Sequence, residues 1–227
     1  IILHMEKKIF AKKNALVIGG TKGTGLEIAR LLLQKGAKVT CTGRNTREQL
    51  SGIEFIFCDI DNCGIENFCD GVIGEKLSAT DILVVTFGPF CQKPLHLTAA
   101  KEWAQMALDN YALPGILASK AIPAMMERRW GRIIFFGGTR TESVRGYKTN
   151  AAYAGAKTGI SVITKSIAME YAQYGITCNA VLPGFTSHAP EGTQTVSEHA
   201  LAENAVSLMS KEELNGVLLN VDRGWSV

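Results

Sequence analysis

Short apolar runs, rich in β-branched residues, recur along the chain and leave room for a helix between most successive runs. Each run is apolar at nearly every position, and strands that are apolar on both faces belong to a parallel sheet covered by helices. The predicted strands cover residues 15–18, 38–42, 53–58, 82–87, 132–136, 176–182 and 216–221.

Stretches with helical periodicity lie between these strands, at residues 25–35, 99–128, 151–174 and 199–209. Pro114 falls inside the second stretch, where a proline kinks a helix or divides it in two. Strand and helix alternate throughout, without an internal repeat or a linker. This order predicts an α/β fold, a single-domain, Rossmann-type, doubly wound, seven-stranded parallel sheet flanked by helices.

Composition narrows the class of protein further. A chain of 227 residues with 46% hydrophobic and 20% charged residues fits one domain with one large core. We assign that domain to residues 12–227 and interpret residues 1–11 as a probable tag remnant and N-terminal extension. The six cysteines lack Cys-x-x-Cys pairs and zinc spacing, so we expect reduced core residues and no metal.

Charge and hydropathy bear on location and partners. The formal charge is only +3, and basic residues gather only at 128, 129 and 132, so a nucleic acid is not an expected partner. No apolar run reaches the ~18 residues of a membrane span, and the start lacks the layout of a signal peptide. We therefore expect a cytoplasmic protein that does not bind membranes.

A glycine-rich turn joins the first predicted strand to the first predicted helix. Glycines at such a turn let the backbone approach a pyrophosphate at a helix N-terminus, although a tight turn alone would look the same. The spacing is G-x-x-x-G-x-G rather than the common G-x-G-x-x-G. The candidate cofactor-binding residues of this turn are Gly19, Thr21, Lys22, Gly23, Thr24 and Gly25.

The end of the second strand bears on the choice of cofactor. A dinucleotide fold that prefers NAD places an acid there to hold the ribose hydroxyls, but this chain has Thr42. Arg44 and Lys22 supply two cations that could meet a ribose 2′-phosphate, unless both are solvated loop charges. We therefore expect NADP(H) to be favoured over NAD(H).

Tyr153 and Lys157 lie one helical turn apart, so their side chains share a face. A nearby ammonium favours the phenolate, which would tune the phenol as an acid or base at neutral pH. The pair alone could equally be a buried tyrosine beside an unrelated lysine.

The glycine turn, Asn110, the Tyr153–Lys157 pair and Pro183-Gly184 stand in an order that resembles the short-chain dehydrogenase/reductase family. The resemblance runs from about Lys12 to an Asp-Arg-Gly tail at 222–224. It implies that Tyr153 exchanges a proton with the substrate oxygen and that Lys157 lowers the pKa of Tyr153 and binds the nicotinamide ribose.

The same resemblance gives roles to further residues. Asn110 would hold a water on a proton relay, or it is only a polar helix kink. Thr186, in the segment after Pro183 and Gly184, would bond the nicotinamide carboxamide, and Asp59 would bond the adenine amino group unless it is a turn cap. Gly88 is the one residue kept from the Asn-Asn-Ala-Gly motif, which reads Val-Thr-Phe-Gly here.

Two departures from the family pattern stand out. Gly138 occupies the place of the catalytic serine, so the hydroxyl comes from elsewhere or is missing. Thr139 is the first candidate, because the paired glycines could bulge the strand and re-aim it; Thr141 and Ser143 follow. The segment from 187 to 201 is about twenty residues shorter than the family's substrate-covering segment, and its His188 and Glu191 are candidate substrate contacts.

The resemblance implies an NADPH-dependent reductase of ketones or aldehydes, working reversibly as an alcohol dehydrogenase. The closest general likeness is to 3-oxoacyl-carrier-protein reductases, in which case Arg128, Arg129 and Arg132 could meet an acidic carrier protein, unless they form a solvated turn. The alternatives are a reductase of another small carbonyl compound and a catalytically silent NADP(H)-binding scaffold or sensor. A homotetramer or homodimer is expected.

Overall fold

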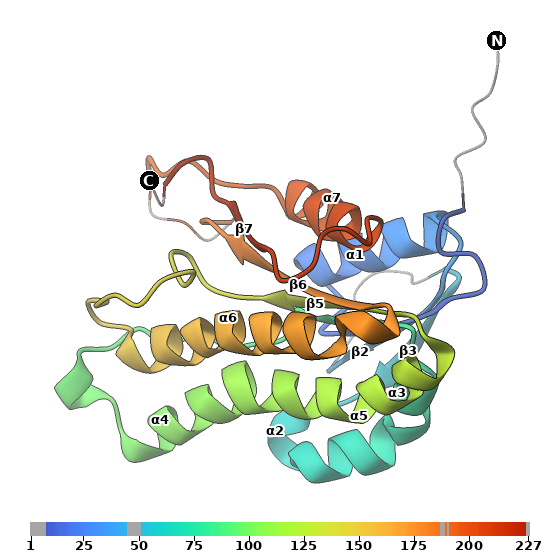
Figure 1. Ribbon diagram of the computed structural model, residues 1–227. Helices are drawn as coiled ribbons and strands as arrows, with labels where there is room; N and C mark the ends of the chain where they lie inside the picture. Colours follow the sequence, from blue (N-terminus) through green and yellow to red (C-terminus); the bar gives the residue numbers. More distant parts are fainter. Residues whose placement is uncertain (1–7, 45–50, 187–188, 190, 226–227) are drawn as a thin grey trace.

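A seven-stranded, fully parallel sheet forms the centre of the molecule, with strand order β3-β2-β1-β4-β5-β6-β7 (Figure 1). The computed structural model describes residues 8–44, 51–186, 189 and 191–225. The prediction of a seven-stranded Rossmann-type sheet is confirmed. The strands are β1 Asn14–Ile18, β2 Lys38–Gly43, β3 Ile53–Phe57, β4 Ile82–Val85, β5 Gly131–Phe136, β6 Ile176–Pro183 and β7 Leu218–Val221.

Helices cover both faces of this sheet (Figure 1). The pair α1 and α7 lies on one face, and α3, α5 and α6 lie on the other. The α-helices are α1 Gly23–Gln34, α2 Ile60–Cys63, α3 Gly74–Ala79, α4 Ala100–Ala107, α5 Leu113–Arg128, α6 Ala151–Tyr171 and α7 Glu198–Met209. The short helices between β3 and β4, α2, the π-helix η1 Asn67–Val72 and α3, were not predicted; 3-10 turns cover Leu95–Leu97 (η2) and Ala172–Tyr174 (η4).

Each face of the sheet has its own hydrophobic core. Alternate residues of β1 point to opposite sides, so Leu16 and Ile18 pack under α5 and α6, whereas Val17 packs under α1 and α7. Phe10, which the expected domain boundary left outside the domain, is 2% exposed and belongs to the core under α1.

The long helical stretch after β4 changes its geometry near Pro114. Helix α4 passes into the π-helix η3 Leu108–Ala112, and α5 follows with Pro114 in its first turn. Proline has no N–H to donate to the carbonyl four residues earlier, which is that of Asn110. The predicted division at Pro114 is thus a π-helical segment, a feature frequent at functional sites. It contains the fully buried Asn110.

The strand order reverses beside β1, which pairs with β2 on one side and β4 on the other. In open α/β sheets, ligands bind at the carboxyl ends of the strands where the order reverses. The glycine turn, Gly88 and Gly138 all follow strands at this edge.

Candidate active site

The glycine turn is held in place by the side chain of Thr86, which follows β4, the neighbour of β1 in the sheet. Gly19 has φ +85, and a Cβ on Gly25 would clash with the Gly19 carbonyl and lie 2.7 Å from Thr86 Oγ1. Thr86 Oγ1 lies 3.0 Å from the Ile18 carbonyl oxygen and 3.1 Å from that of Gly19, to which it donates. Thr86 thus ties the turn to the end of β4, a role that the sequence did not reveal.

Helix α1 begins at Gly23 directly after this turn. Lys22 is its N-cap in an extended conformation and makes no side-chain cap, so the first N–H groups of a twelve-residue helix keep their capacity to bind an anion. Thr24 is half-buried in the first turn, and Gly23 is exposed. The predicted turn residues therefore lie at a helix N-terminus without a side-chain cap.

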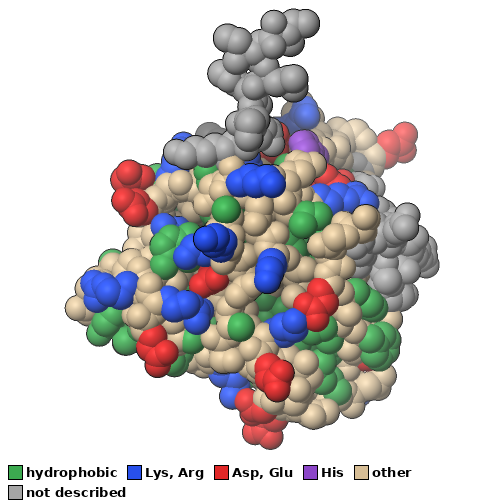
Figure 2. Space-filling view, turned by 90° about the vertical axis from the view of Figure 1, so that its right-hand side faces the viewer, with side chains coloured by type: hydrophobic (Ala, Val, Ile, Leu, Met, Phe, Trp, Pro, Cys, Tyr) green, Lys and Arg blue, Asp and Glu red, His purple; other side chains and the backbone are tan. Residues whose placement is uncertain are grey.

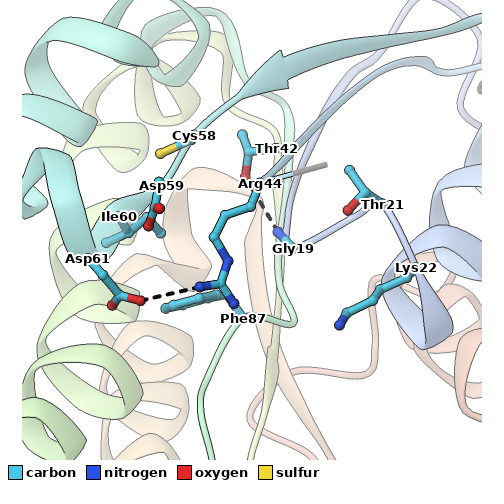
Figure 3. A pocket seen from close by; sticks show the side chains of 11 residues that line it. Gly19, Thr21, Lys22, Thr42, Arg44, Cys58, Asp59, Ile60, Asp61 and Phe87 are labelled. Carbon is cyan, nitrogen blue, oxygen red and sulfur yellow. Dashed lines mark hydrogen bonds and ion pairs between the residues drawn. The ribbon is translucent and has the colours of Figure 1, made fainter. Parts of the chain in front are cut away.

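A cleft of about 290 Å³ opens between the turn and the ends of β2 and β3 (Figure 3). It brings together six predicted residues, Gly19, Thr21, Lys22, Thr42, Arg44 and Asp59. The prediction missed Gly43, Cys58, Ile60, Asp61 and Phe87. Phe87 stands where the family has alanine, and that departure was the one signal available for it.

Thr42 turns inward rather than toward the mouth of the cleft. It is 2% exposed, and its Oγ1 accepts a hydrogen bond from the Gly19 N–H over 3.4 Å. Beside it, a Cβ on Gly43 would lie 2.5 Å from Thr21 Oγ1. These contacts join the end of β2 to the glycine turn, so Thr42 shapes the cleft through the turn.

Asp59 presents an acceptor to the cleft. Its Oδ2 accepts a hydrogen bond from Asn62 Nδ2 at 2.7 Å, and its Oδ1 is buried without a hydrogen-bond partner. A buried acceptor that receives no hydrogen bond destabilises the folded state. Oδ1 therefore suits a ligand N–H, as the resemblance to the family implied.

Tyr153 and Lys157 lie on one face of α6, as predicted from their spacing. Lys157 is 4% exposed, its Nζ donates to the Phe136 carbonyl at 2.9 Å, and this Nζ lies 5.8 Å from the centroid of the Tyr153 ring. Burial lowers the pKa of Lys157 to about 8 and raises the pKa of Tyr153 to about 12. The expected lowering of the Tyr153 pKa by Lys157 is therefore not found here, because burial dominates.

Asn110 and Lys157 meet at Gly88. A Cβ on Gly88 would overlap Asn110 Oδ1 and lie 2.9 Å from Lys157 Nζ. Asn110 Nδ2 donates to the Pro89 carbonyl at 3.0 Å, and Asn110 Oδ1 is buried without a hydrogen-bond partner. Only glycine fits at position 88, which explains why this one residue of the motif is retained.

Gly138 faces the pair at the place expected for the serine. Its Cβ would lie 3.4 Å from Tyr153 Cε1 and 3.3 Å from Lys157 Cβ. Thr141 folds back over it: the Thr141 hydroxyl donates to the Gly138 carbonyl at 2.7 Å and accepts from the Gly138 N–H at 3.0 Å. The second candidate hydroxyl is thus engaged with the backbone.

The first candidate, Thr139, points elsewhere. Its hydroxyl donates to the Pro183 carbonyl at 2.7 Å, at the exit of β6. The tight turn from Gly138 to Thr141, with Arg140 at φ +63, aims Thr139 that way, so the expectation that it bonds the substrate oxygen is not met in this structure. Ser143 is exposed.

Comparisons with known proteins agree with this geometry. The model of the family described as short chain dehydrogenase matches residues 13–200. The chain belongs to the short chain dehydrogenase family, a family of oxidoreductases. It is 35% identical over 187 residues to the 3-oxoacyl-[acyl-carrier-protein] reductase FabG of Salmonella typhimurium, covering 78% of this chain and 74% of FabG.

One further relative and one solved structure are similar to this chain. D-beta-hydroxybutyrate dehydrogenase of Rhizobium meliloti is 28% identical over 185 residues, covering 76% of this chain and 71% of the relative. A solved short chain dehydrogenase/reductase family protein shares the fold with a TM-score of 0.83 and 24% identity, over 96% of this chain and 98% of that chain.

In this short chain dehydrogenase, the residues that follow β6 pack against the end of β7 and against the residues before α7. Gly184 packs against β7, since its Cβ would lie 2.7 Å from Asp222 Cα, and the Val196 N–H bonds the Phe185 carbonyl at 2.8 Å. Thr186 is half-buried, Glu191 is exposed, and His188 lies outside the described residues.

The arginine cluster lies at the opposite edge, where strands begin, so it does not border the active site. Arg128 Nε pairs with Asp81 Oδ1 at 2.9 Å, and Arg132 is 5% exposed and bonds the Met209, Gly131 and Gly175 carbonyls. Arg129 bonds the Gln173 carbonyl. On this face, basic side chains are interspersed with acidic ones (Figure 2). Arg128 and Arg132 thus connect neighbouring elements of the fold, whereas Arg128 and Arg129 remain exposed, and contact with an acidic carrier protein stays a prediction.

Two features are absent from the described part of the chain. No three His, Cys, Asp or Glu side chains gather there in a way that could hold a metal ion. Among the same residues, no helix has the length and apolar character needed to cross a bilayer.

Proposed function

We propose that the protein is an NADPH-dependent reductase that transfers a hydride to a ketone or aldehyde carbonyl, reversibly, in the cytoplasm. The observation that carries the proposal is that Lys157 meets Asn110 at Gly88 and Tyr153 at Gly138, in a fold whose cleft lies at the uncapped N-terminus of α1. The names of the relatives favour a 3-oxoacyl thioester or another small hydroxy or oxo acid as substrate.

The residues present fit a nicotinamide dinucleotide. The N-terminus of α1 and the glycine turn suit the pyrophosphate, Asp59 Oδ1 is an unused acceptor for the adenine amino group, and Lys22 and Arg44 suit a 2′-phosphate. Pro183, Gly184 and Thr186 are the family positions for the nicotinamide half, and Gly88 is kept from the motif that packs on the adenosine side. When bound, the cofactor supplies the hydride.

Tyr153 acts as the proton donor in this proposal. A pKa of about 12 keeps its hydroxyl protonated at neutral pH, which is the form needed for reduction. Lys157 places a cation behind the phenol as the proton leaves, and Asn110 Oδ1 offers an acceptor that can hold a water near Lys157. Positioning these groups beside the substrate carbonyl accounts for the catalysis.

The substrate oxygen receives its hydrogen bond from Tyr153 alone in this scheme. Thr139 and Thr141 commit their protons to backbone carbonyls, and Gly138 has no side chain to offer. Removing one donor from an oxyanion site typically costs about 10²–10³ in turnover. We therefore expect a slow reductase, or one whose substrate carries its own donor beside the carbonyl.

The test is the oxidation of NADPH, followed by absorbance, with a panel of carbonyl compounds that includes an acetoacetyl thioester, free ketones and aldehydes. Turnover of the thioester supports a 3-oxoacyl reductase, whereas turnover confined to free ketones or aldehydes favours a reductase of another small carbonyl compound. If the protein neither binds NADPH nor turns over any compound of the panel, the proposal is refuted.

A silent NADP(H) sensor is the second candidate, favoured by the two engaged hydroxyls at Thr139 and Thr141. It predicts tight NADPH binding with no turnover of any compound in the same panel. The retained Tyr153, Lys157 and Asn110 argue for the reductase, because a scaffold needs none of them.

The proposed active form is a homodimer or homotetramer. Apolar side chains remain exposed on the neighbouring elements α4, η3 and α6, namely Trp103, Leu108, Tyr111, Val162 and Met169. Contact of η3 with α6 is close, since Tyr111 fills the space over Gly159. A second copy of the chain is the occupant that the family favours for this face.

We expect Val162→Glu, at a position 60% exposed, to shift the protein to monomers in sedimentation velocity. A charge buried in a subunit contact without a partner is strongly unfavourable. Val144→Glu, at a side chain 94% exposed in the loop before α6, is the matched control and should leave the sedimentation coefficient unchanged. An unaltered oligomer in Val162→Glu would place the contact elsewhere.

A further inference from the structure

Arg44 reaches across the cleft to an acid on its far wall. It follows β2, whereas Asp61 lies in the first turn of α2, and Arg44 Nη1 lies 3.6 Å from Asp61 Oδ2. Figure 3 shows the guanidinium extended toward Asp61, with Lys22 reaching in from the opposite side. All three residues line the same cleft.

This inference rests on the proposed preference for NADP(H). We propose that Asp61 is a specificity-determining residue that competes with the cofactor's 2′-phosphate for the guanidinium of Arg44. Without a 2′-phosphate, as with NADH, the ion pair stays in place. With NADPH, Arg44 must give up Asp61, and the carboxylate remains near the phosphate.

The neighbouring acid does not have this role. Asp59 accepts a hydrogen bond from Asn62 through Oδ2 and its Oδ1 is buried without a partner, whereas Asp61 is paired with Arg44. A guanidinium presents a planar fork that can bind either a carboxylate or a phosphate through two hydrogen bonds, so the two anions can compete for it. Asp61 therefore acts as an internal stand-in for the phosphate.

The expected effect is moderate, because both partners are exposed, Arg44 by 64% and Asp61 by 53%. Exposed ion pairs contribute little, and salt screens them. Releasing Arg44 and removing the repulsion between carboxylate and phosphate should together change NADPH affinity by about three- to tenfold at low salt. The change should shrink as the salt concentration rises.

The experiment measures dissociation constants for NADPH and NADH by fluorescence titration at low salt. Four proteins are compared: the unmodified full chain, Asp61→Asn, Arg44→Gln and the variant that carries both substitutions. Asp70→Asn is the matched control, because it removes the same charge from an exposed pair with Lys120 outside the cleft. Thermal melts followed by circular dichroism check that each variant folds.

We expect Asp61→Asn to tighten NADPH binding three- to tenfold, to change NADH binding less than twofold, and to have a clearly smaller effect when Arg44 is Gln, because only the repulsion between carboxylate and phosphate is then removed. Asp70→Asn should change neither constant. An equal gain from Asp61→Asn with and without Arg44 would overturn the competition, since it would reflect repulsion alone. No gain, with Arg44→Gln still weakening NADPH, would also overturn it while leaving the proposed cofactor preference intact. If Arg44→Gln changes neither cofactor and NADH binds as tightly as NADPH, the cofactor preference itself fails.

Discussion

Replacing Tyr153 with Phe should lower carbonyl reduction by about 10²–10⁴-fold while NADPH still binds. The substitution removes only the hydroxyl that gives the proton, and general acids typically contribute this range. The ring itself stays supported, because Phe90 packs edge-on against it with centroids 4.8 Å apart and an interplanar angle of 79°. Initial rates and NADPH titrations on the same preparations measure the two effects separately.

Tyr147→Phe is the matched control for Tyr153→Phe. The Tyr147 hydroxyl bonds the Arg140 carbonyl at 2.6 Å in the loop before α6, so its loss disturbs the loop without removing the proposed acid. We expect at most a few-fold change in rate. If Tyr153→Phe retains more than a tenth of the wild-type rate, another group must protonate the product.

The strands could be predicted because their signal is local. In β4, every residue from Ile82 to Val85 is buried, because helices cover both faces of the sheet. A strand of this kind is recognisable in the sequence as a run of consecutive apolar residues. The helices between β3 and β4 escaped prediction, since helices of four to six residues carry too few turns for a periodic pattern.

Part of the candidate active site could also be predicted, because its signal is local in the sequence. The glycine turn, Gly88 and the Tyr153–Lys157 pair are fixed by short-range spacing at strand ends or along one helix. Asp61 and Thr86 were missed because their roles depend on which strands become neighbours in the sheet. Arg132 shows the converse: three basic residues close in sequence indicate a charged surface, but the carbonyl acceptors that bury Arg132 come from distant segments.

Thr139 shows that spacing along the sequence does not predict where a side chain points. Its distance from Tyr153 suited the missing serine, yet a side chain's direction depends on backbone angles that spacing does not encode. The positive φ of Arg140 and the hydrogen bonds between Thr141 and Gly138 turn the Thr139 hydroxyl toward Pro183. In the proposed mechanism Tyr153 therefore acts without the usual hydroxyl partner, and Lys157 becomes more important.

Lys157→Met should abolish turnover and yet make the folded chain more stable at neutral pH. Lys157 is 4% exposed, and burial lowers its pKa from 10.5 to about 8. A lowered pKa means that the folded state resists the charged form, at a cost of roughly 3 kcal/mol when the lysine is protonated. Methionine fills a similar volume without charge and loses the charge-assisted bond to the Phe136 carbonyl, worth about 1.5–3 kcal/mol. We expect a net gain of at most about 1.5 kcal/mol at pH 7.

The sign of this effect gives it a characteristic pH dependence. Between pH 8 and 10.5 the unfolded chain binds more protons at Lys157 than the folded chain does, so wild-type stability from this group rises with pH. Tyr153 acts oppositely, because its raised pKa of about 12 makes stability fall above pH 10. Subtracting the variant from the wild type removes most of the tyrosine contribution. The advantage of Lys157→Met should therefore fade as pH rises from 8 to 10.5.

Urea unfolding at pH 7, 9 and 10.5 measures this difference in free energy. Lys165→Met is the matched control, an exposed lysine on the same helix α6, and should shift the unfolding free energy by less than about 0.5 kcal/mol at each pH. A Lys157→Met variant that is less stable than wild type at pH 7 would show that the contacts of the ammonium outweigh its burial. In that case Lys157 would stabilise the fold, as Arg132 does. The loss of activity in Lys157→Met would then no longer distinguish a catalytic role of Lys157 from a structural one.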